Sequence, residues 1–325
     1  MKHIRHCASR RSLTLAVLLP ALALMTAGPS AASESGGDTT QHQDARPTVV
    51  LVHGYWADSS GWTRVIGNLQ AEGYRVIAPA NPLRSLSGDA DYLATLLKTI
   101  EGPIVLVGHS YGGAVITNAA AGNPNVESLV YIAGFAPDKG ESAFELAARY
   151  PGSRITDDPT APVPTALNAV PLGGGPTDVD LYLKPEKFSD VFLSDRLEAN
   201  RAAALAAAQR PGTVASGNEP TAATAWKDIP SWFLVPTDDR TIGTANLRFM
   251  AERAGSTTVE VDGPHAVMET APDEITDLIL QAAHDSSRPA LAHTGSAEQL
   301  TVLGGAAVLA LATGTGLVVL ARRRT

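Results

Sequence analysis

Short apolar runs alternate with amphipathic stretches through most of the chain. The runs are rich in Val, Ile and Leu, and several are nearly continuous, as in strands that are covered on both faces. We expect strands at Thr48–Val52, Tyr74–Ala78, Ile104–Val107, Ser128–Ala133, Trp232–Val235 and Thr257–Val261. Between them apolar residues recur at helical spacing, as at Leu93, Leu96, Leu97 and Ile100. This alternation predicts an α/β fold over residues 47–284, with a mostly parallel sheet flanked by helices.

The stretch from about residue 137 to 228 interrupts this alternation. It is rich in Pro, Gly and Ala and has helical patterns near Ser142–Tyr150 and Leu197–Gln209. A long insertion between a strand and the next crossover is typical of a lid over a binding site. The aromatic residues that favour a packed helical lid over a disordered loop are Tyr182, Phe188 and Phe192.

The first 32 residues have the pattern of a signal peptide. Four basic residues precede or begin an apolar stretch, Leu13–Ala27, and we expect cleavage after Ala32. Ser9–Leu13 also resembles a twin-arginine export signal, so the export route stays open. An uncleaved membrane anchor is the alternative, but Pro20 interrupts the short apolar stretch. Residues 33–46 are polar, and we expect a disordered linker there.

The C-terminal segment predicts attachment to the cell surface. Leu300–Ala321 is an uncharged run long enough to cross a bilayer, and the basic residues 322–324 that follow it would stay cytoplasmic. A tether over 285–299 precedes this transmembrane helix and contains the pentapeptide Leu291–Gly295. The order of pentapeptide, apolar run and basic tail resembles the sorting signal of sortase-anchored surface proteins of Gram-positive bacteria. The Ala at its second position resembles the actinobacterial variant.

This resemblance implies that sortase cleaves after Thr294 and joins the chain to peptidoglycan. The alternative is a membrane anchor that stays uncleaved, in which case the pentapeptide has no role. In both cases the domain would face the outside of the cell, in the cell wall or on the outer face of the cytoplasmic membrane.

Composition narrows the classes of partner. Cys7 is the single cysteine and lies in the signal peptide, so we expect neither disulfides nor thiol catalysis. Without residues 1–32 and 295–325, the 25 basic residues lose seven and the 33 acidic residues lose one. That leaves 18 and 32, a formal charge of −14. Such an acidic domain argues against nucleic acid and anionic lipid as partners.

The most informative motif is the sequence Gly-His-Ser-Tyr-Gly at residues 108–112, directly after an expected strand. A strand, a sharp turn with Ser110 at its centre and a following helix form the nucleophile elbow of serine hydrolases. Small residues on either side of the serine let strand and helix pass close together. We therefore expect Ser110 to be a catalytic nucleophile.

A base and an acid are expected to follow late strands, where ligands bind to sheets of this kind. His265 lies in a loop after Thr257–Val261, and His109 is its rival. We expect the side chain of His109 to leave the turn on the side opposite to the serine. For the acid, Asp238 and Asp239 both follow the strand at Trp232–Val235.

The first strand ends in His53-Gly54, which resembles the oxyanion loop of the α/β-hydrolase superfamily. The resemblance implies that backbone N–H groups of Tyr55 and Tyr111 form the oxyanion hole, and that His53 only holds the loop. Comparison with the superfamily favours Asp239 over Asp238 as the acid. Asp262 is too close in sequence to His265 to orient its ring.

Together these motifs resemble the small carboxylesterase branch of the superfamily, near plant methyl esterases and hydroxynitrile lyases. Lyase chemistry in that branch needs threonine and lysine where this chain has Gly54 and Ala266. The resemblance therefore implies a serine esterase that cleaves small-molecule carboxylic esters through an acyl-enzyme, with no cofactor and no metal. Perhydrolysis or other acyl transfer on the same triad remains an alternative, as does a surface binding protein without catalysis.

Overall fold

The structure, a computed structural model, describes residues 46–158, 160–161, 163–175 and 178–286. The expected signal peptide, nearly all of the expected linker, the expected sorting motif, the expected transmembrane helix and the basic tail lie outside the described residues. Among the helices that are described, none is long and apolar enough to span a membrane.

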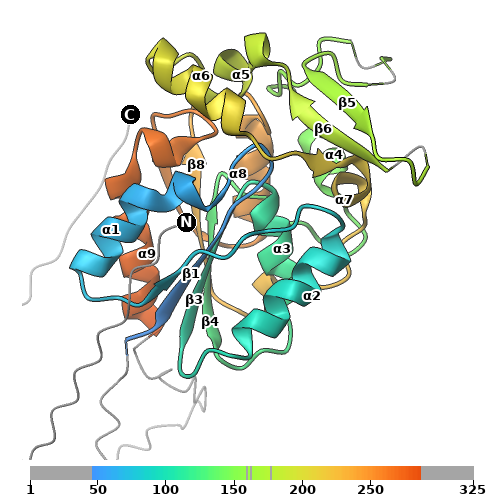
Figure 1. The fold of residues 1–325 in the computed structure, drawn as a ribbon. Helices are drawn as coiled ribbons and strands as arrows, with labels where there is room; N and C mark the ends of the chain where they lie inside the picture. Colours follow the sequence, from blue (N-terminus) through green and yellow to red (C-terminus); the bar gives the residue numbers. More distant parts are fainter. Residues whose placement is uncertain (1–45, 159, 162, 176–177, 287–325) are drawn as a thin grey trace, which may run out of the picture. The chain divides into compact units, whose positions relative to one another are not determined.

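A six-stranded parallel sheet forms the centre of the domain, in the order β2-β1-β3-β4-β8-β9 (Figure 1). Its strands are β1 (Thr48–Val52), β2 (Val76–Ile77), β3 (Ile104–His109), β4 (Val126–Ile132), β8 (Ser231–Pro236) and β9 (Thr257–Val261). This confirms the α/β fold and all six expected strands. The strand expected at Tyr74–Ala78 is shorter than predicted, because β2 is an edge strand that pairs with β1 over only two positions.

Helices cover both faces of this sheet. On one face lie α1 (Thr63–Ala71) and α9 (Pro272–Ser286), whose apolar side chains pack on alternate residues of the strands, such as Val105 and Val107. On the other face lie α2 (Leu86–Leu97), α3 (Tyr111–Ala119) and α8 (Thr244–Arg253). Both faces of the strands are thus buried, which explains why their sequences are nearly continuous in apolar residues.

The insertion between β4 and β8 is packed, as expected, and its helices are α4 (Ala143–Ala147), α5 (Pro185–Leu193), α6 (Ala199–Ala208) and α7 (Val214–Asn218). It also contains an antiparallel sheet that the sequence analysis did not predict, made of β5 (Leu167–Pro171), β6 (Val179–Leu183) and β7 (Gly212–Thr213). Unlike most strands of the large sheet, β5 and β6 are not continuous apolar runs, since Asn168 and Asp180 interrupt them, and β7 has only two residues. We call residues 137–228 the lid.

Three short 3₁₀ helices complete the described elements: η1 (Ser59–Trp62), η2 (Ala225–Lys227) and η3 (Val267–Glu269).

Candidate active site

Ser110 lies in the sharp turn between β3 and α3. Its backbone has φ 55° and ψ −126°, a conformation with positive φ that costs energy in any residue except glycine. A side-chain carbon added at Gly108 would lie 2.6 Å from the carbonyl oxygen of Gly112, and one added at Gly112 would overlap the carbonyl oxygen of Val52. The strained turn therefore depends on glycine at both positions, as the sequence motif indicates.

His265 and Asp239 are in direct contact. The Nδ1 of His265 lies 2.6 Å from Oδ2 of Asp239, and both side chains are fully buried. The loops after β8 and β9, which are neighbours in the sheet, bring these two residues together.

The second carboxylate oxygen of Asp239 accepts hydrogen bonds from the backbone N–H groups of Thr241, Ile242 and Gly243, at 2.9, 2.8 and 3.3 Å. Burial raises the pKa of this carboxyl, but His265 and these N–H groups outweigh burial and lower the pKa below its usual value. Asp239 is therefore an ionised acceptor that keeps the proton of His265 on Nδ1.

The rival acids do not contact His265. Asp238 forms ion pairs with Arg240 and Arg196, at 3.0 and 3.4 Å. Asp262 is exposed and pairs with Arg196 at 2.8 Å. Of the two aspartates that follow β8, it is Asp239 that meets the histidine.

With Nδ1 bonded to Asp239, the Nε2 of His265 carries the free electron pair. Among the described residues this buried atom has no hydrogen-bond partner, and Ser110 and His265 are not hydrogen-bonded to each other. The imidazole packs edge-on against Phe192 of α5, with 5.3 Å between ring centroids. Ser110 itself is 5% exposed, so the lid closes over this part of the molecule.

His109 lies closer to His265 than the sequence analysis predicts, with their ring centroids 4.8 Å apart. Its Nε2 donates to the backbone carbonyl of His265 at 3.0 Å. Burial, and secondarily the charge of His265, lowers the pKa of His109 to about 3, so its ring is neutral at ordinary pH. The loop that carries His265 reaches the side chain of His109. His109 thus joins the histidine loop to the elbow.

His53 holds the loop after β1. The backbone N–H of Asn81 donates to its Nε2 at 3.0 Å, and the Asn81 amide donates to its backbone carbonyl at 2.9 Å. Since Nε2 accepts, Nδ1 carries the proton and donates to the carbonyl of Gly54 at 3.0 Å. Both ring nitrogens form hydrogen bonds, so His53 has the structural role that the sequence analysis predicts, which is to hold this loop.

Gly54 lies against the nucleophile. A side-chain carbon added there would lie 2.6 Å from the Cβ of Ser110 and 2.9 Å from the backbone nitrogen of Tyr111. No side chain fits at this position without moving the elbow. The glycine that distinguishes this chain from lyase-like sequences is therefore also required by its packing.

The backbone N–H groups of Tyr55 and Tyr111 follow Gly54 and Ser110 directly. Within the described part of the chain, neither N–H has an acceptor, although both residues are buried. Buried N–H groups are rarely left without a partner, and pairs of them at one site are suited to an oxyanion.

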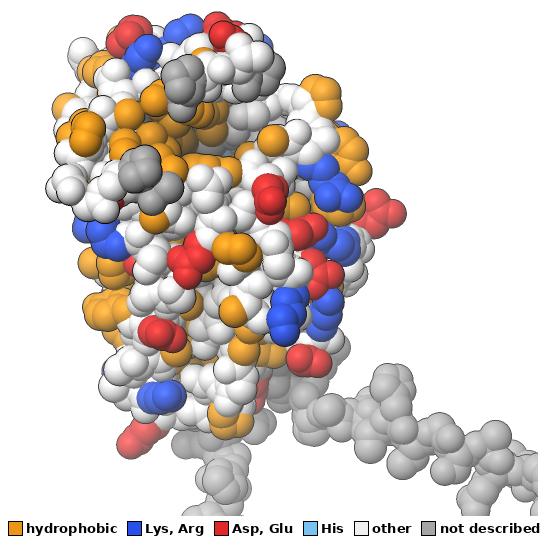
Figure 2. Space-filling view, turned by 90° about the vertical axis from the view of Figure 1, so that its right-hand side faces the viewer, with side chains coloured by type: hydrophobic (Ala, Val, Ile, Leu, Met, Phe, Trp, Pro, Cys, Tyr) orange, Lys and Arg blue, Asp and Glu red, His pale blue; other side chains and the backbone are white. Residues whose placement is uncertain are grey.

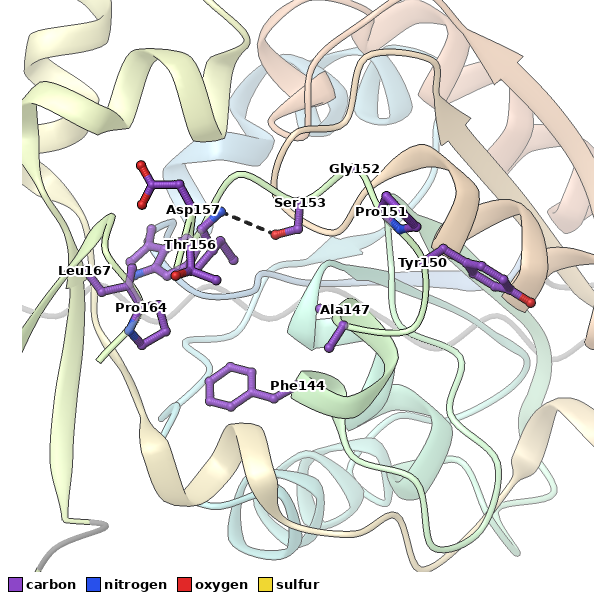
Figure 3. Close-up of a pocket in the computed structure, with 13 residues that line it drawn as sticks. Phe144, Ala147, Tyr150, Pro151, Gly152, Ser153, Thr156, Asp157, Pro164 and Leu167 are labelled. Atoms are coloured by element: carbon purple, nitrogen blue, oxygen red, sulfur yellow. Dashed lines mark hydrogen bonds between the residues drawn. The ribbon is translucent and has the colours of Figure 1, made fainter. Parts of the chain in front are cut away.

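An apolar cavity of about 620 Å³ lies within the lid, and Trp56 of the loop after β1 completes its lining. Figure 2 shows a hollow lined by hydrophobic side chains on this part of the surface. In Figure 3, Phe144 and Ala147 of α4 line one side of the cavity, and Pro164 and Leu167 line another. Asp157 is the only charged residue in its described lining.

Trp56 separates this cavity from a second, much smaller one of about 40 Å³, which Ala266 and Phe192 help to line. The indole N–H donates to the carbonyl of Leu181 in β6, so the lid fixes the tryptophan. Sequence reasoning singled out Phe192 only as a residue that packs in the lid and did not single out Trp56, because the contacts of both depend on how the lid packs on the sheet. Among the described residues, no group of three or more His, Cys, Asp or Glu residues could hold a metal ion.

Comparison with known proteins agrees with this architecture. Residues 49–278 match the model of the alpha/beta hydrolase family. The chain belongs to this family. The match includes β1, the elbow, the lid and the loops that carry Asp239 and His265, and ends within α9.

Two characterised relatives of this hydrolase have names that agree with the predicted class of enzyme. The carbendazim hydrolyzing esterase of Nocardioides sp. is 36% identical over 110 residues, which cover 30% of this chain and 46% of that esterase. The alignment thus spans less than half of that relative. The pyrethroid hydrolase of Sphingobium wenxiniae is 27% identical over 253 residues, covering 72% of this chain and 87% of that enzyme.

Solved structures show the same fold at low sequence identity. Polyneuridine aldehyde esterase has a TM-score of 0.60 and 18% identity, and the superposition covers 73% of this hydrolase and 98% of that chain. The pyrethroid hydrolase PytH has a TM-score of 0.59 and 21% identity, with 74% and 99% covered. An extracellular alpha/beta-hydrolase from a Paenibacillus species has a TM-score of 0.56 and 21% identity, with 73% and 98% covered.

Proposed function

We propose that this hydrolase is an exported serine esterase in which Ser110, His265 and Asp239 form the catalytic triad. The observation that carries the proposal is the 2.6 Å contact between buried His265 and ionised Asp239, which leaves Nε2 without a partner among the described residues. The His265 ring also lies against that of His109, the residue that precedes the elbow serine. A histidine held in this tautomer is a general base whose free nitrogen accepts a proton.

In the proposed reaction, Ser110 Oγ attacks the ester carbonyl while His265 Nε2 takes its proton. The N–H groups of Tyr55 and Tyr111 stabilise the oxyanion that forms. The tetrahedral intermediate then breaks its bond to the alcohol oxygen, which receives the proton from His265, and the acyl group stays on Ser110. Water, deprotonated by His265, attacks the acyl-enzyme and releases the acid.

Export and surface attachment rest on the sequence at both ends of the chain. The signal peptide supports translocation, and the order of pentapeptide, apolar run and basic tail supports sortase-dependent attachment to peptidoglycan. We expect the mature protein in the cell-wall fraction, and its loss from that fraction when Thr294 is replaced by alanine. Recovery of both forms in the membrane fraction alone would favour the uncleaved anchor.

The cavity within the lid supports a preference for esters with a bulky apolar group. Its volume of about 620 Å³ accommodates an extended acyl chain or a ring system, and its lining is mostly apolar. An acetyl group would leave most of this volume unfilled.

A series of p-nitrophenyl esters, from acetate to dodecanoate, tests this preference on the full chain. We expect kcat/KM to rise with acyl length. Replacing Ala147, which faces the cavity, with tryptophan should lower kcat/KM for the long esters about tenfold and change acetate less than about twofold.

Ala169→Trp is the matched control, because Ala169 is exposed on β5 and is not among the residues that line the cavity. Equal losses with acetate and with long esters in Ala147→Trp, or a preference of the wild type for acetate, would contradict the assignment of the cavity.

A further inference from the structure

The side chains of the two residues that supply the oxyanion-hole N–H groups are stacked on each other. The rings of Tyr55 and Tyr111 have centroids 4.5 Å apart and planes inclined by 24°. Both tyrosines are buried, at 5% and 1% exposure. The hydroxyl group of each has a buried polar partner.

The Tyr111 hydroxyl donates to Oδ2 of Asp89 at 2.9 Å. Asp89 lies in the first turn of α2, next to α3, and is only 1% exposed. Its other carboxylate oxygen accepts from the backbone N–H of Arg84 at 3.2 Å. Burial raises the pKa values of both Tyr111 and Asp89, and the phenol remains the donor of this bond.

The Tyr55 hydroxyl lies 2.6 Å from Oγ of Ser216, a residue of α7 in the lid. Ser216 Oγ donates to the carbonyl of Thr213 at 3.1 Å, so it accepts the hydrogen of Tyr55. A side-chain carbon at Gly212 would overlap the Tyr55 ring, so the lid backbone lies directly on this ring. Tyr111 is thus anchored to α2, a helix that covers the sheet, and Tyr55 is anchored to the lid.

We propose that Asp89 and Ser216 are positioning residues for the oxyanion hole, holding the N–H groups of Tyr111 and Tyr55 through the hydroxyl groups of the two stacked tyrosines. This inference rests on the proposed esterase function. A backbone N–H stabilises an oxyanion only within a narrow range of positions, and displacements of about 1 Å are costly in rate. Because the oxyanion exists only after attack, loss of the anchors lowers kcat and leaves KM nearly unchanged.

The anchor at Ser216 has a second consequence. Ser216 belongs to the lid. The Tyr55 hydroxyl therefore has this hydrogen-bond partner only when residues 212–216 are packed on the Tyr55 ring. The lid therefore contributes to the reaction centre as well as to the cavity, and the donor of Tyr55 is positioned by lid closure.

The test compares Tyr111→Phe, Asp89→Ala, Asp89→Asn and Ser216→Ala in the full chain. The readouts are kcat, KM, the melting temperature and the inhibition constant of an aryl trifluoromethyl ketone, which forms a tetrahedral oxyanion on the serine. Tyr131→Phe is the control, because Tyr131 is also buried and its hydroxyl, 2.8 Å from that of Thr117, bonds to neither Tyr55 nor Tyr111.

We expect Tyr111→Phe, Asp89→Ala and Ser216→Ala to lower kcat about tenfold, to weaken the ketone by a similar factor and to change KM less than about twofold. Asp89→Asn keeps an acceptor for the tyrosine and should recover most of kcat. Tyr131→Phe should lower the melting temperature without changing kcat.

The inference is overturned if kcat and ketone affinity stay within about twofold of the wild type in Tyr111→Phe and Ser216→Ala, which remove single hydroxyl groups. It is equally overturned if Tyr131→Phe causes the same losses. If the wild type hydrolyses esters and the variants keep its kcat and ketone affinity, only the positioning role is refuted. A wild type without turnover refutes the proposed function, and the positioning role with it.

Discussion

Replacing Ser110 with alanine is expected to abolish ester hydrolysis, with a decrease in kcat of at least about 10⁴-fold. The substitution removes the nucleophile but leaves the turn, the glycines at 108 and 112 and the buried pair of His265 and Asp239 in place. Alanine at a positive φ is no more strained than serine, so we expect the melting temperature to change little. Initial rates with a p-nitrophenyl ester and a thermal melt of the same preparation measure both effects.

Ser87→Ala is the control for this experiment. Ser87 is exposed on α2 and lines neither cavity, and it does not lie in a nucleophile elbow. We expect this variant to keep most of the activity. If Ser110→Ala kept more than about a tenth of wild-type kcat, Ser110 could not be the nucleophile.

The second large effect is expected for Asp239→Asn, a decrease in kcat of about 10⁴-fold. The asparagine oxygen can replace the oxygen that accepts from Thr241, Ile242 and Gly243. Its amide NH₂ then faces Nδ1 of His265 and donates to it, which moves the histidine proton to Nε2. The histidine can no longer accept the serine proton. Steady-state kinetics with circular dichroism at matched concentration measures the loss against retained structure.

Asp238→Asn is the matched control, since Asp238 is the neighbouring aspartate and forms partly exposed ion pairs with Arg240 and Arg196. Such pairs contribute about 0–1 kcal/mol, so we expect less than about a threefold change in kcat. An equal decrease in kcat from the two substitutions would mean that the charge of the whole loop matters. Asp239 would then have no specific role as the partner of His265.

The sequence was sufficient for those features that depend on local pattern. The apolar runs predicted the six strands, and the glycines around Ser110 predicted the turn. Because the carboxyl ends of parallel strands lie at one edge of the sheet, the loops after β8 and β9 could be expected to bring an acid and a histidine together. That expectation agrees with the contact between Asp239 and His265.

Features that arise from long-range packing could not be predicted in this way. Asp89 lies in an amphipathic helix and has the sequence context of an ordinary surface carboxylate. It is buried because α2 packs on α3, where Tyr111, 22 residues later, donates to it. The strands of the lid lack the continuous apolar runs of the central sheet, because Asn168 and Asp180 interrupt β5 and β6. Trp56 is held by two distant lid residues, since its backbone N–H donates to Arg210 and its indole N–H to Leu181 of β6. The contact of His109 with His265 depends likewise on the path of a distant loop.

Active-site labelling tests the central claim most directly. The full chain is treated with a fluorophosphonate, which reacts with activated serines, and the adduct is located by mass spectrometry of proteolytic peptides. The account predicts one adduct per chain, on Ser110, with labelling greatly slowed in Asp239→Asn. A chain that remains unlabelled, or that carries the adduct on another residue, would contradict it.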